Sequence, residues 1–534
     1  MFTNKKSLLA LSVASTFALT GCFSDDDNNK PVPDGGGDGG DGGVVIVAPE
    51  APAALDFVIS GSVVENEEFN VLSNATVKFM ENSEPSTNIV AVDGSNAQTL
   101  TNAGSFVVTL KEGADLDNVT AIVSAEGYIS KVFNVDLTNE DDFDVLTAQF
   151  ILFTGDSDEV KQEVVNKTLT SATTSEEIVA DAQIGTKSLA SATLPSGTTL
   201  QNAQGETVAA GELSLSVLGL DPTSDTKGSV IPEGLNANNT SGNVAVPVSL
   251  ADITMTVGGT KVKNFSGDTL KVTLAAPSDL DAGETLTVKS LDEDTGVWED
   301  ESFVVTKGTG TVSFETDHLT WFSVNKSAAA CSTGLSTTVT GDAVPAGGLL
   351  FVAASSDGLG ISVLPEGATS EDVFSGIALT RYGFSEDAMA EVYVFDNEGG
   401  LWFESDGEVG VCGTVPVELT RPYEVVSKTL TLSGVCAQDN SQAVDVSNSV
   451  VTYNRENKRG KSVLKNADGN FDLSGLRAEE NYQVTVNFRG LPLVGSNTFT
   501  LENVDDSDVS QQFEFTCNEV TGSGGSGGSG GTGG

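Results

Sequence analysis

The chain has very few of the residues that active sites and nucleic-acid surfaces use. Its 534 residues include one histidine, His318, and three tryptophans, with 26 basic residues against 76 acidic ones. A serine–histidine–acid triad needs an imidazole as its general base, so His318 is the one candidate for that role. Binding to phosphate backbones needs clusters of Lys and Arg. A formal net charge of −50 therefore argues against nucleic acid as a partner.

Short catalytic and metal-binding motifs are also absent from the sequence. There is no phosphate-binding loop, dinucleotide fingerprint or haem-attachment pair, and no Cys-x-x-Cys pair indicates zinc. His318 lies among alternating apolar residues before Trp321, which favours a structural role at a strand edge. Residues 155–157 (Gly-Asp-Ser) resemble the nucleophile block of GDS-type hydrolases, but Glu315 stands where that family has Asp, and the helices of its α/β fold are missing. We therefore predict no enzymatic activity, no catalytic residue, no metal and no cofactor.

The start of the chain carries a targeting pattern. A basic pair at 5–6 precedes an apolar run at 8–19, and residues 19–22 read Leu-Thr-Gly-Cys. The run is too short for the roughly 20 residues that span a bilayer, so a cleaved signal is favoured. The pattern resembles the lipobox of bacterial lipoprotein signal peptides, which implies cleavage before Cys22 and a membrane anchor made by acylation of that residue. Because the next residue is Phe and not Asp, the resemblance implies the outer membrane.

Residues 22–54 are predicted to form a disordered, acidic, Gly-rich tether. Three aspartates at 25–27, a Pro-Val-Pro at 31–33 and Gly/Asp repeats at 34–43 cannot bury a core, and their like charges keep the segment extended. The aspartates are also potential calcium ligands, but without ordered backbone around them we interpret them as part of a solvated linker.

From residue 55 onward the sequence has a β pattern. Short runs rich in Val, Thr, Ile and Phe alternate with turn residues about every 8 to 12 positions, and no amphipathic helical pattern exceeds about two turns. We predict an all-β fold of tandem β-sandwich modules, Ig-like or transthyretin-like, after the tether. The predicted order is a signal peptide (1–21), the tether (22–54), four β modules (55–155, 156–327, 328–423 and 424–520) and a Gly/Ser tail (521–534).

Two of these modules resemble the carboxypeptidase regulatory-like, transthyretin-type sandwich. Residues 55–155 carry its G-x-V, N-A-x-V, G-x-F and A-x-G-Y elements in order, at 61–63, 74–77, 104–106 and 125–128. Residues 424–520 fit a similar pattern, with an Asp-Gly hairpin signal at 468–469 but no clean A-x-G-Y element. Residues 156–327 resemble the β-domain that follows such modules in many surface proteins, cartilage intermediate layer protein among the distant ones.

Four cysteines remain once Cys22 takes the lipid, and export favours their oxidation to disulfides. Cys331 and Cys412 are separated by 81 positions, and so are Cys436 and Cys517. Because each spacing brackets about one sandwich, we predict the disulfides Cys331–Cys412 and Cys436–Cys517.

Two further features bear on ligand binding. Residues 292–296 resemble the opening of an EF-hand loop, but Val297 replaces its glycine and Phe303 its final glutamate, so a hairpin turn is the favoured interpretation. Trp402 follows two glycines and offers a carbohydrate platform if it is exposed on a hairpin, although a core role is favoured.

These observations predict a non-catalytic, lipid-anchored protein of the bacterial outer membrane. Its role would be that of a binding or spacer element in adhesion or envelope assembly, held to the membrane through Cys22 and open to a protein or glycan ligand on the cell surface. The alternative is a carbohydrate-binding or accessory subunit of an envelope enzyme system.

Overall fold

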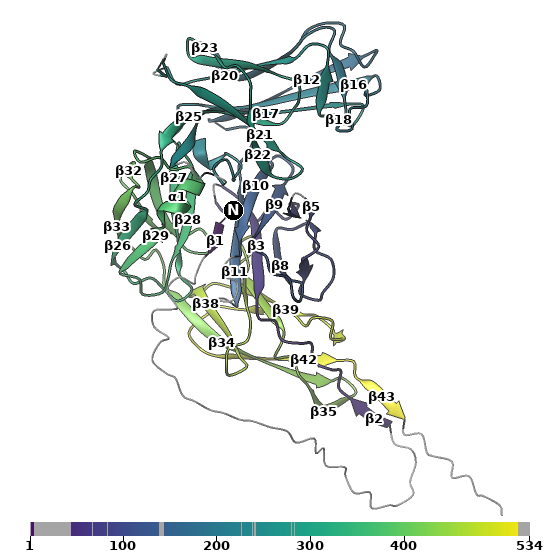
Figure 1. Cartoon of the computed structure of the whole chain (residues 1–534). Coiled ribbons are helices and arrows are strands. Elements are labelled where there is room, and N and C mark those ends of the chain that lie inside the picture. Colours follow the sequence, from purple (N-terminus) through teal and green to yellow (C-terminus); the bar gives the residue numbers. More distant parts are fainter. Residues whose placement is uncertain are drawn as a thin grey trace, which may run out of the picture.

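The computed structural model describes residues 2–4, 44–66, 68–82, 84–137, 144–157, 159–225, 227–237, 239, 242–278, 280–281 and 283–521. The predicted lipidation site Cys22, and most of the predicted signal peptide, tether and tail, lie outside these ranges. Within them the chain is all-β, as predicted, and its single α-helix is α1 (Gly376–Tyr382). The strands form four β-sandwiches, which we number in chain order (Figure 1).

The first sandwich packs two sheets, ordered β1-β11-β3-β8-β6 and β10-β9-β4-β5, with β7 paired to β4. Its first and last long strands, β3 and β11, run side by side in parallel. β1 lies in the predicted signal peptide, so cleavage before Cys22 would leave β11 as the edge of its sheet. The strand bounds are β1 (Phe2–Asn4), β3 (Val58–Glu65), β4 (Thr76–Glu81), β5 (Glu84–Pro85), β6 (Ile89–Ala91), β7 (Thr99–Thr101), β8 (Ser105–Leu110), β9 (Asn118–Ser124), β10 (Lys131–Asp136) and β11 (Val145–Leu152).

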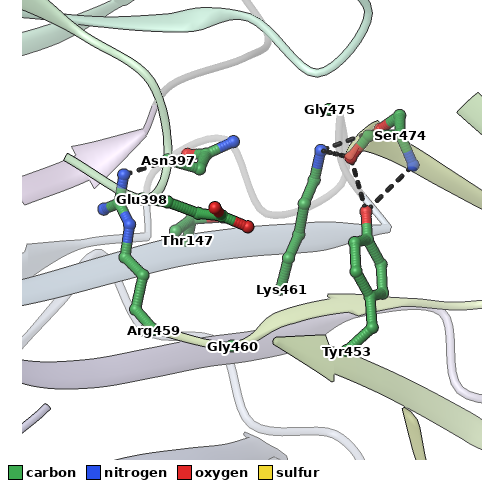
Figure 2. A pocket seen from close by; sticks show the side chains of 9 residues that line it. All are labelled: Thr147, Asn397, Glu398, Tyr453, Arg459, Gly460, Lys461, Ser474 and Gly475. Carbon is green, nitrogen blue, oxygen red and sulfur yellow. Dashed lines mark hydrogen bonds between the residues drawn. The ribbon is translucent and has the colours of Figure 1, made fainter. Parts of the chain in front are cut away.

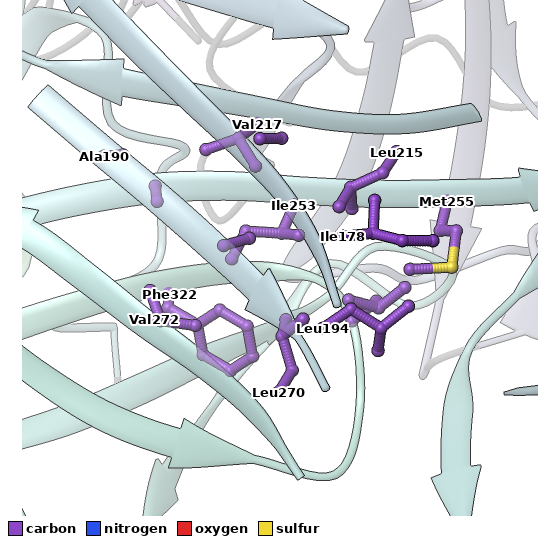
Figure 3. Packing of buried hydrophobic residues seen from close by; sticks show 14 of the residues in the cluster. Ile178, Ala190, Leu194, Leu215, Val217, Ile253, Met255, Leu270, Val272 and Phe322 are labelled. Carbon is purple, nitrogen blue, oxygen red and sulfur yellow. The ribbon is translucent and has the colours of Figure 1, made fainter. Parts of the chain in front are cut away.

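The second sandwich has the largest of the apolar cores. One sheet runs β12-β16-β17-β25-β21-β22 with β18 beside β17, the facing sheet runs β13-β14-β20-β24-β23, and β15 pairs with β19. Alternate residues of facing strands, among them Leu194, Leu215, Met255 and Phe322, interdigitate between the sheets (Figure 3), as expected for period-2 strands. The bounds are β12 (Val160–Leu169), β13 (Ile178–Ile184), β14 (Lys187–Leu194), β15 (Thr199–Gln201), β16 (Gly211–Leu220), β17 (Asn243–Val257), β18 (Thr260–Val262), β19 (Asn264–Ser266), β20 (Leu270–Ala275), β21 (Leu286–Asp292), β22 (Val297–Glu301), β23 (Thr306–Gly308), β24 (Thr311–Thr316) and β25 (Trp321–Ala329), with a 3₁₀ turn η4 (Lys227–Ser229).

The third sandwich pairs the sheet β29-β26-β33 with the sheet β28-β27-β30-β31, to which β32 adds beside β30. Helix α1 begins at the N-cap Ser375, whose hydroxyl accepts the Ala378 amide, and ends at Gly383 in the left-handed conformation that glycine tolerates. The bounds are β26 (Leu335–Gly341), β27 (Leu349–Ser355), β28 (Leu359–Leu364), β29 (Ser370–Phe374), β30 (Met389–Phe395), β31 (Leu401–Glu404), β32 (Val409–Gly410) and β33 (Gly413–Leu419).

The fourth sandwich faces the sheet β35-β34-β42-β40, with β38 beside β34, against the sheet β37-β36-β39-β41. Its first and last long strands, β34 and β42, are parallel neighbours, as are β26 and β33 of the third sandwich. The bounds are β34 (Val425–Cys436), β35 (Asp439–Val444), β36 (Val450–Asn454), β37 (Lys461–Val463), β38 (Phe471–Arg477), β39 (Tyr482–Asn487), β40 (Leu493–Val494), β41 (Thr498–Leu501), β42 (Val509–Phe515) and β43 (Asn518–Thr521).

The prediction of a structureless tether over 22–54 is wrong at its C-terminal end. Strand β2 (Val44–Val47) pairs antiparallel with β43, so Thr521, assigned to the tail, is also in a strand. The sequence Val-Val-Ile-Val is a run of β-branched residues, and this local preference for strand outweighs the Gly-rich context before it. Ile46 and Ala48 then pack against the core of the fourth sandwich.

The four sandwiches do not form a linear string. The first sandwich lies centrally and packs on each of the others (Figure 1). Its contact with the second is an apolar cluster that includes Ile129, Trp298 and Trp321. A second cluster around Ile151 joins it to the third sandwich, and a small one around Val450 joins it to the fourth. The second sandwich lies at one end of the molecule, and the β2–β43 ribbon extends from the other.

Candidate functional site: a charged junction between three sandwiches

All six arginines of the chain lie between residues 381 and 489. The four in the fourth sandwich each reach a neighbouring segment. Arg455 and Arg477 contact the third sandwich, Arg459 contacts both the first and the third, and Arg489 donates to Val92 O of the first at 2.9 Å. In a chain this acidic, the arginines are concentrated where the sandwiches meet.

Two buried carboxylates receive these arginines. Asp396 and Glu398 lie in the turn between β30 and β31, where Asp396 Oδ1 accepts the backbone amides of Glu398 and Gly400 at 2.8 and 2.7 Å. Arg477 Nη2 lies 3.1 Å from Asp396 Oδ2, and its Nε lies 3.2 Å from Glu398 Oε2. Arg455 Nε donates to the same Glu398 oxygen. A buried ion pair of this kind is costly to break, because the remaining charge is left without water or partner.

Arg459 is the most deeply buried of the four, with 4% of its surface exposed. Its Nη1 donates to Gln149 Oε1 of β11, and its Nη2 donates to Asp396 O at 3.1 Å. Nη2 also donates to Asn397 Oδ1 at 3.2 Å (Figure 2). Burial lowers the pKa of Arg459 to about 10, against the opposing effect of Asp396 and Glu398. The guanidinium therefore stays charged at neutral pH and links three sandwiches at one point.

Aromatic packing closes one side of this junction. The Arg477 guanidinium lies 3.8 Å from the centre of the Tyr423 ring, a favourable cation–π distance. Tyr423 in turn meets Trp402 edge to face at 6.5 Å. A side chain at Gly400 would place its Cβ 2.0 Å from Tyr423 Oη, so this turn needs glycine. Trp402 is only 2% exposed, which confirms the core role over a carbohydrate platform.

The junction leaves little room for a ligand. Its cavity of about 20 Å³ is lined by Thr147, Asn397, Glu398, Tyr453, Arg459, Gly460, Lys461, Ser474 and Gly475. Tyr453 Oη donates to Ser474 O at 2.8 Å, and Lys461 Nζ donates to Ser474 Oγ at 2.8 Å (Figure 2). A space of this size suits one water molecule at most. The arrangement therefore holds the sandwiches together and does not form a substrate pocket.

A more open, polar cleft of about 350 Å³ lies between the third and fourth sandwiches. Lys428 lines it, with Nζ 2.6 Å from Asp505 Oδ1 and 2.6 Å from Ser507 O. The other lining residues are Ala346, Gly347, Glu366, Ser427, Thr429, Asp472, Ser474 and Asp508.

A buried lysine marks the joint between the first and second sandwiches. Lys131 Nζ donates to Ser229 O at 2.5 Å and lies 5.3 and 5.4 Å from the rings of Phe133 and Phe153. Burial lowers the pKa of Lys131 to about 7, because an ammonium group in apolar surroundings loses its hydration.

The four cysteines other than Cys22 form disulfides in the structure. They join Cys331 to Cys412 and Cys436 to Cys517, with Cα atoms 5.6 and 5.5 Å apart. These are the pairs that the equal spacing predicts. Each disulfide lies beside a parallel pair of first and last strands, which explains why cysteines so far apart in sequence meet.

The other sequence-derived candidates make local contacts within the second sandwich and the turn before it. His318 Nε2 lies 3.3 Å from Glu301 Oε1, and the imidazole packs 5.3 Å from the Phe322 ring. Ser157 Oγ accepts the amides of Glu159 and Val160 in the turn before β12. Residues 292–296 form the turn between β21 and β22, as the hairpin interpretation predicts.

Two findings concern metals and membranes. No group of three or more His, Cys, Asp and Glu side chains in the described part of the chain is placed to hold a metal ion. Within those same ranges, no helix is both long and apolar enough to span a bilayer.

Comparison with known proteins gives only distant structural likenesses. No protein-family profile and no curated protein matches the chain. Among solved structures, the minor pilin GBS52 of Streptococcus agalactiae aligns at 9% identity over 35% of this chain and 98% of its own, with a TM-score of 0.18. The major pilin BcpA of Bacillus cereus aligns at 8% identity over 86% and 99%, with a TM-score of 0.14. Two B repeats of the Staphylococcus aureus collagen-binding protein align at 12% identity over 86% and 99%, with a TM-score of 0.13. TM-scores this low carry no argument about the present chain.

Proposed function

We propose that the protein is a lipid-anchored protein of the bacterial outer membrane whose sandwiches form one rigid, non-catalytic body. This body would act as a spacer or binding element in adhesion or envelope assembly, and would present the second sandwich away from the membrane. The observation that carries the proposal is the junction at Arg459, which ties three sandwiches together from one side chain.

The position of the chain ends supports the orientation. Val44, where the described chain resumes after the predicted anchor, pairs with Thr521 at the other end of the described chain. Both ends therefore leave the body together, on the side opposite the second sandwich (Figure 1). An anchor at Cys22 would place the fourth sandwich nearest the membrane and the second sandwich farthest from it.

The composition and topology support the surface role. A strongly negative chain resists adsorption to anionic surfaces and stays soluble. We also propose that residues 55–155 and 424–520 are regulatory-like modules of one type, because both carry the sequence pattern of that family. Their parallel first and last strands are compatible with this, although the third sandwich shares that feature. The three tryptophans, Trp298, Trp321 and Trp402, are all buried. Since glycan platforms need exposed aromatics, the spacer role is favoured over the carbohydrate-binding alternative.

The anchor is tested by replacing Cys22 with Ala. The variant should lose metabolic labelling with an alkyne fatty acid and leave the membrane fraction, whereas the neighbouring Ser24→Ala control should keep both. Unchanged labelling of Cys22→Ala would refute the lipoprotein proposal.

The orientation is tested by energy transfer to a lipid-borne acceptor. The chain from Cys22 onward is coupled through that thiol to vesicles, with a donor dye on p-azidophenylalanine at exposed Thr260 of β18 or exposed Gln442 of β35. Strong transfer from position 442 and weak transfer from position 260 are expected. Equal transfer from both positions would contradict the proposed orientation.

A further inference from the structure

The β2–β43 ribbon is the most apolar exposed feature at the tether end of the molecule. Val44, Val45 and Val47 of β2 are 53, 58 and 44% exposed, and Val520 of β43 is 51% exposed. The ribbon register places Val45 opposite Val520. Val45 and Val47 therefore share one face of the ribbon with Val520, while Val44 lies on the other face. Contiguous exposed apolar residues of this kind mark interaction sites.

The outer edge of β2 is also open. Among the described strands, β2 pairs only with β43, so no strand is hydrogen-bonded to its other edge, although β35 lies close to it. Natural edge strands are usually protected by short length, charge, proline or a bulge. β2 is short, but it carries no charge, proline or bulge: its four residues, Val-Val-Ile-Val, are all β-branched, and each is paired one to one in a regular register. β43, by contrast, carries Glu519. The open edge of β2 is therefore suited to accept another strand.

We propose that β2 pairs with β2 of a second copy of this chain when copies share a membrane, so that two ribbons form one four-stranded sheet. Antiparallel pairing of this strand with itself is self-complementary: a two-fold axis keeps each side chain on its own face of the sheet, so Ile46 lies opposite Ile46 and Val45 of one copy lies opposite Val47 of the other. The proposal rests on the membrane anchor of the proposed function, because a four-residue strand pair is far smaller than a stable interface in dilute solution.

The length of the tether explains why the membrane matters. The 22 steps from Cys22 to Val44 reach about 75 Å at full extension, which confines every anchored ribbon to a thin layer above the bilayer. Confinement raises the effective concentration of one ribbon around another and compensates for the weak contact. The ribbon itself is a poor membrane ligand, because it has none of the Trp, Tyr or Lys that favour the bilayer interface.

The proposal is tested by photo-crosslinking on vesicles. The chain from Cys22 onward is coupled through its one unpaired thiol to maleimide lipids, so natural acylation is not needed. Benzoylphenylalanine replaces Val47 in the test protein and exposed Val297 of the second sandwich in the control. A crosslinked dimer is expected from position 47 on vesicles, with little from the same protein in solution and none from position 297.

A matched pair of substitutions identifies the edge as the cause. Val45→Lys, which adds a charge to the edge, should lower the dimer yield from position 47 at least about fivefold. Val179→Lys, at an exposed valine of the second sandwich, should leave it unchanged. Crosslinks to lipid in place of dimers would show that the ribbon contacts the membrane. A dimer yield unchanged by Val45→Lys would show that the copies meet elsewhere. Either result overturns the proposal. Loss of Cys22 acylation in cells would count only against the proposed anchor.

Discussion

Replacing Lys131 with Met should stabilise the protein near neutral pH. The Lys131 side chain is buried against two phenylalanine rings, and its only described hydrogen bond is to a backbone carbonyl. Its pKa is about 7 in the folded chain against 10.5 as the ordinary value. The folded state therefore binds fewer protons than the unfolded state between these two pH values, and stability rises with pH across that window.

The size of the effect follows from the shift. One pKa unit corresponds to about 1.4 kcal/mol, so charging Lys131 at pH 7 and below costs the fold about 5 kcal/mol. Methionine removes this cost with little change in volume, but leaves Ser229 O without its donor, a loss of about 1 to 3 kcal/mol. We expect a net gain of about 2 to 4 kcal/mol at pH 7 that falls as the pH rises and becomes a net loss of about 1 to 3 kcal/mol by pH 10.5, where Lys131 is neutral in the folded chain.

Urea unfolding of the two proteins at a series of pH values measures this directly. Every other titrating group is common to both, so the difference between their unfolding free energies isolates Lys131. The exposed Lys167→Met control should show no such difference. A Lys131→Met variant that is less stable at pH 7, or a difference that does not change with pH, would refute the assignment of a desolvated amine at this joint.

Three further predictions concern the junction, the disulfides and catalysis. Arg459→Met should destabilise the chain by about 1 to 3 kcal/mol in urea unfolding. It leaves Gln149 Oε1, Asp396 O and Asn397 Oδ1 without their buried donor, and this loss exceeds the relief gained by no longer desolvating the guanidinium. Exposed Arg421→Met should cost under about 0.5 kcal/mol; equal small effects would show that the junction contributes nothing. Non-reducing peptide mapping should recover Cys331–Cys412 and Cys436–Cys517; a crossed pair or free thiols would contradict the pairing. Replacing both cysteines of the second pair with serine (Cys436→Ser and Cys517→Ser) should lower the free energy of unfolding by about 4.5 kcal/mol on the loop-entropy account. Purified protein should turn over no ester, peptide or glycan substrate, and any turnover that His318→Ala abolished would overturn the non-catalytic assignment.

Local chemistry in the sequence predicted the sandwiches well. Alternating apolar residues and Asp-Gly turns are local patterns, and the structure has strands and turns at these places. The disulfides span 81 positions, but the even number of cysteines and their equal spacing were enough to predict the pairing. The run Val-Val-Ile-Val at 44–47 also has a local preference for strand. The Gly-rich composition before it favoured a structureless tether instead, and that prediction is wrong for this segment.

The junction could not be located in the same way. Arg459 and Gln149 are 310 positions apart, and no local pattern connects them. One signal was available: all six arginines lie within the last third of a very acidic chain. Because arginine is the residue best suited to buried, multiply bonded ion pairs, that clustering points to contacts between modules. Which modules meet depends on the packing of whole sandwiches, which sequence periodicity does not specify.

The claim that the sandwiches form one rigid body is tested most directly by a distance distribution between the second and fourth sandwiches. Nitroxide labels on p-azidophenylalanine at Thr260 and Gln442 would be measured by double electron–electron resonance in frozen solution. We predict a single narrow distribution that broadens when Arg459 is replaced by Met. A broad distribution in the unsubstituted chain would contradict the rigid body and favour flexibly linked modules.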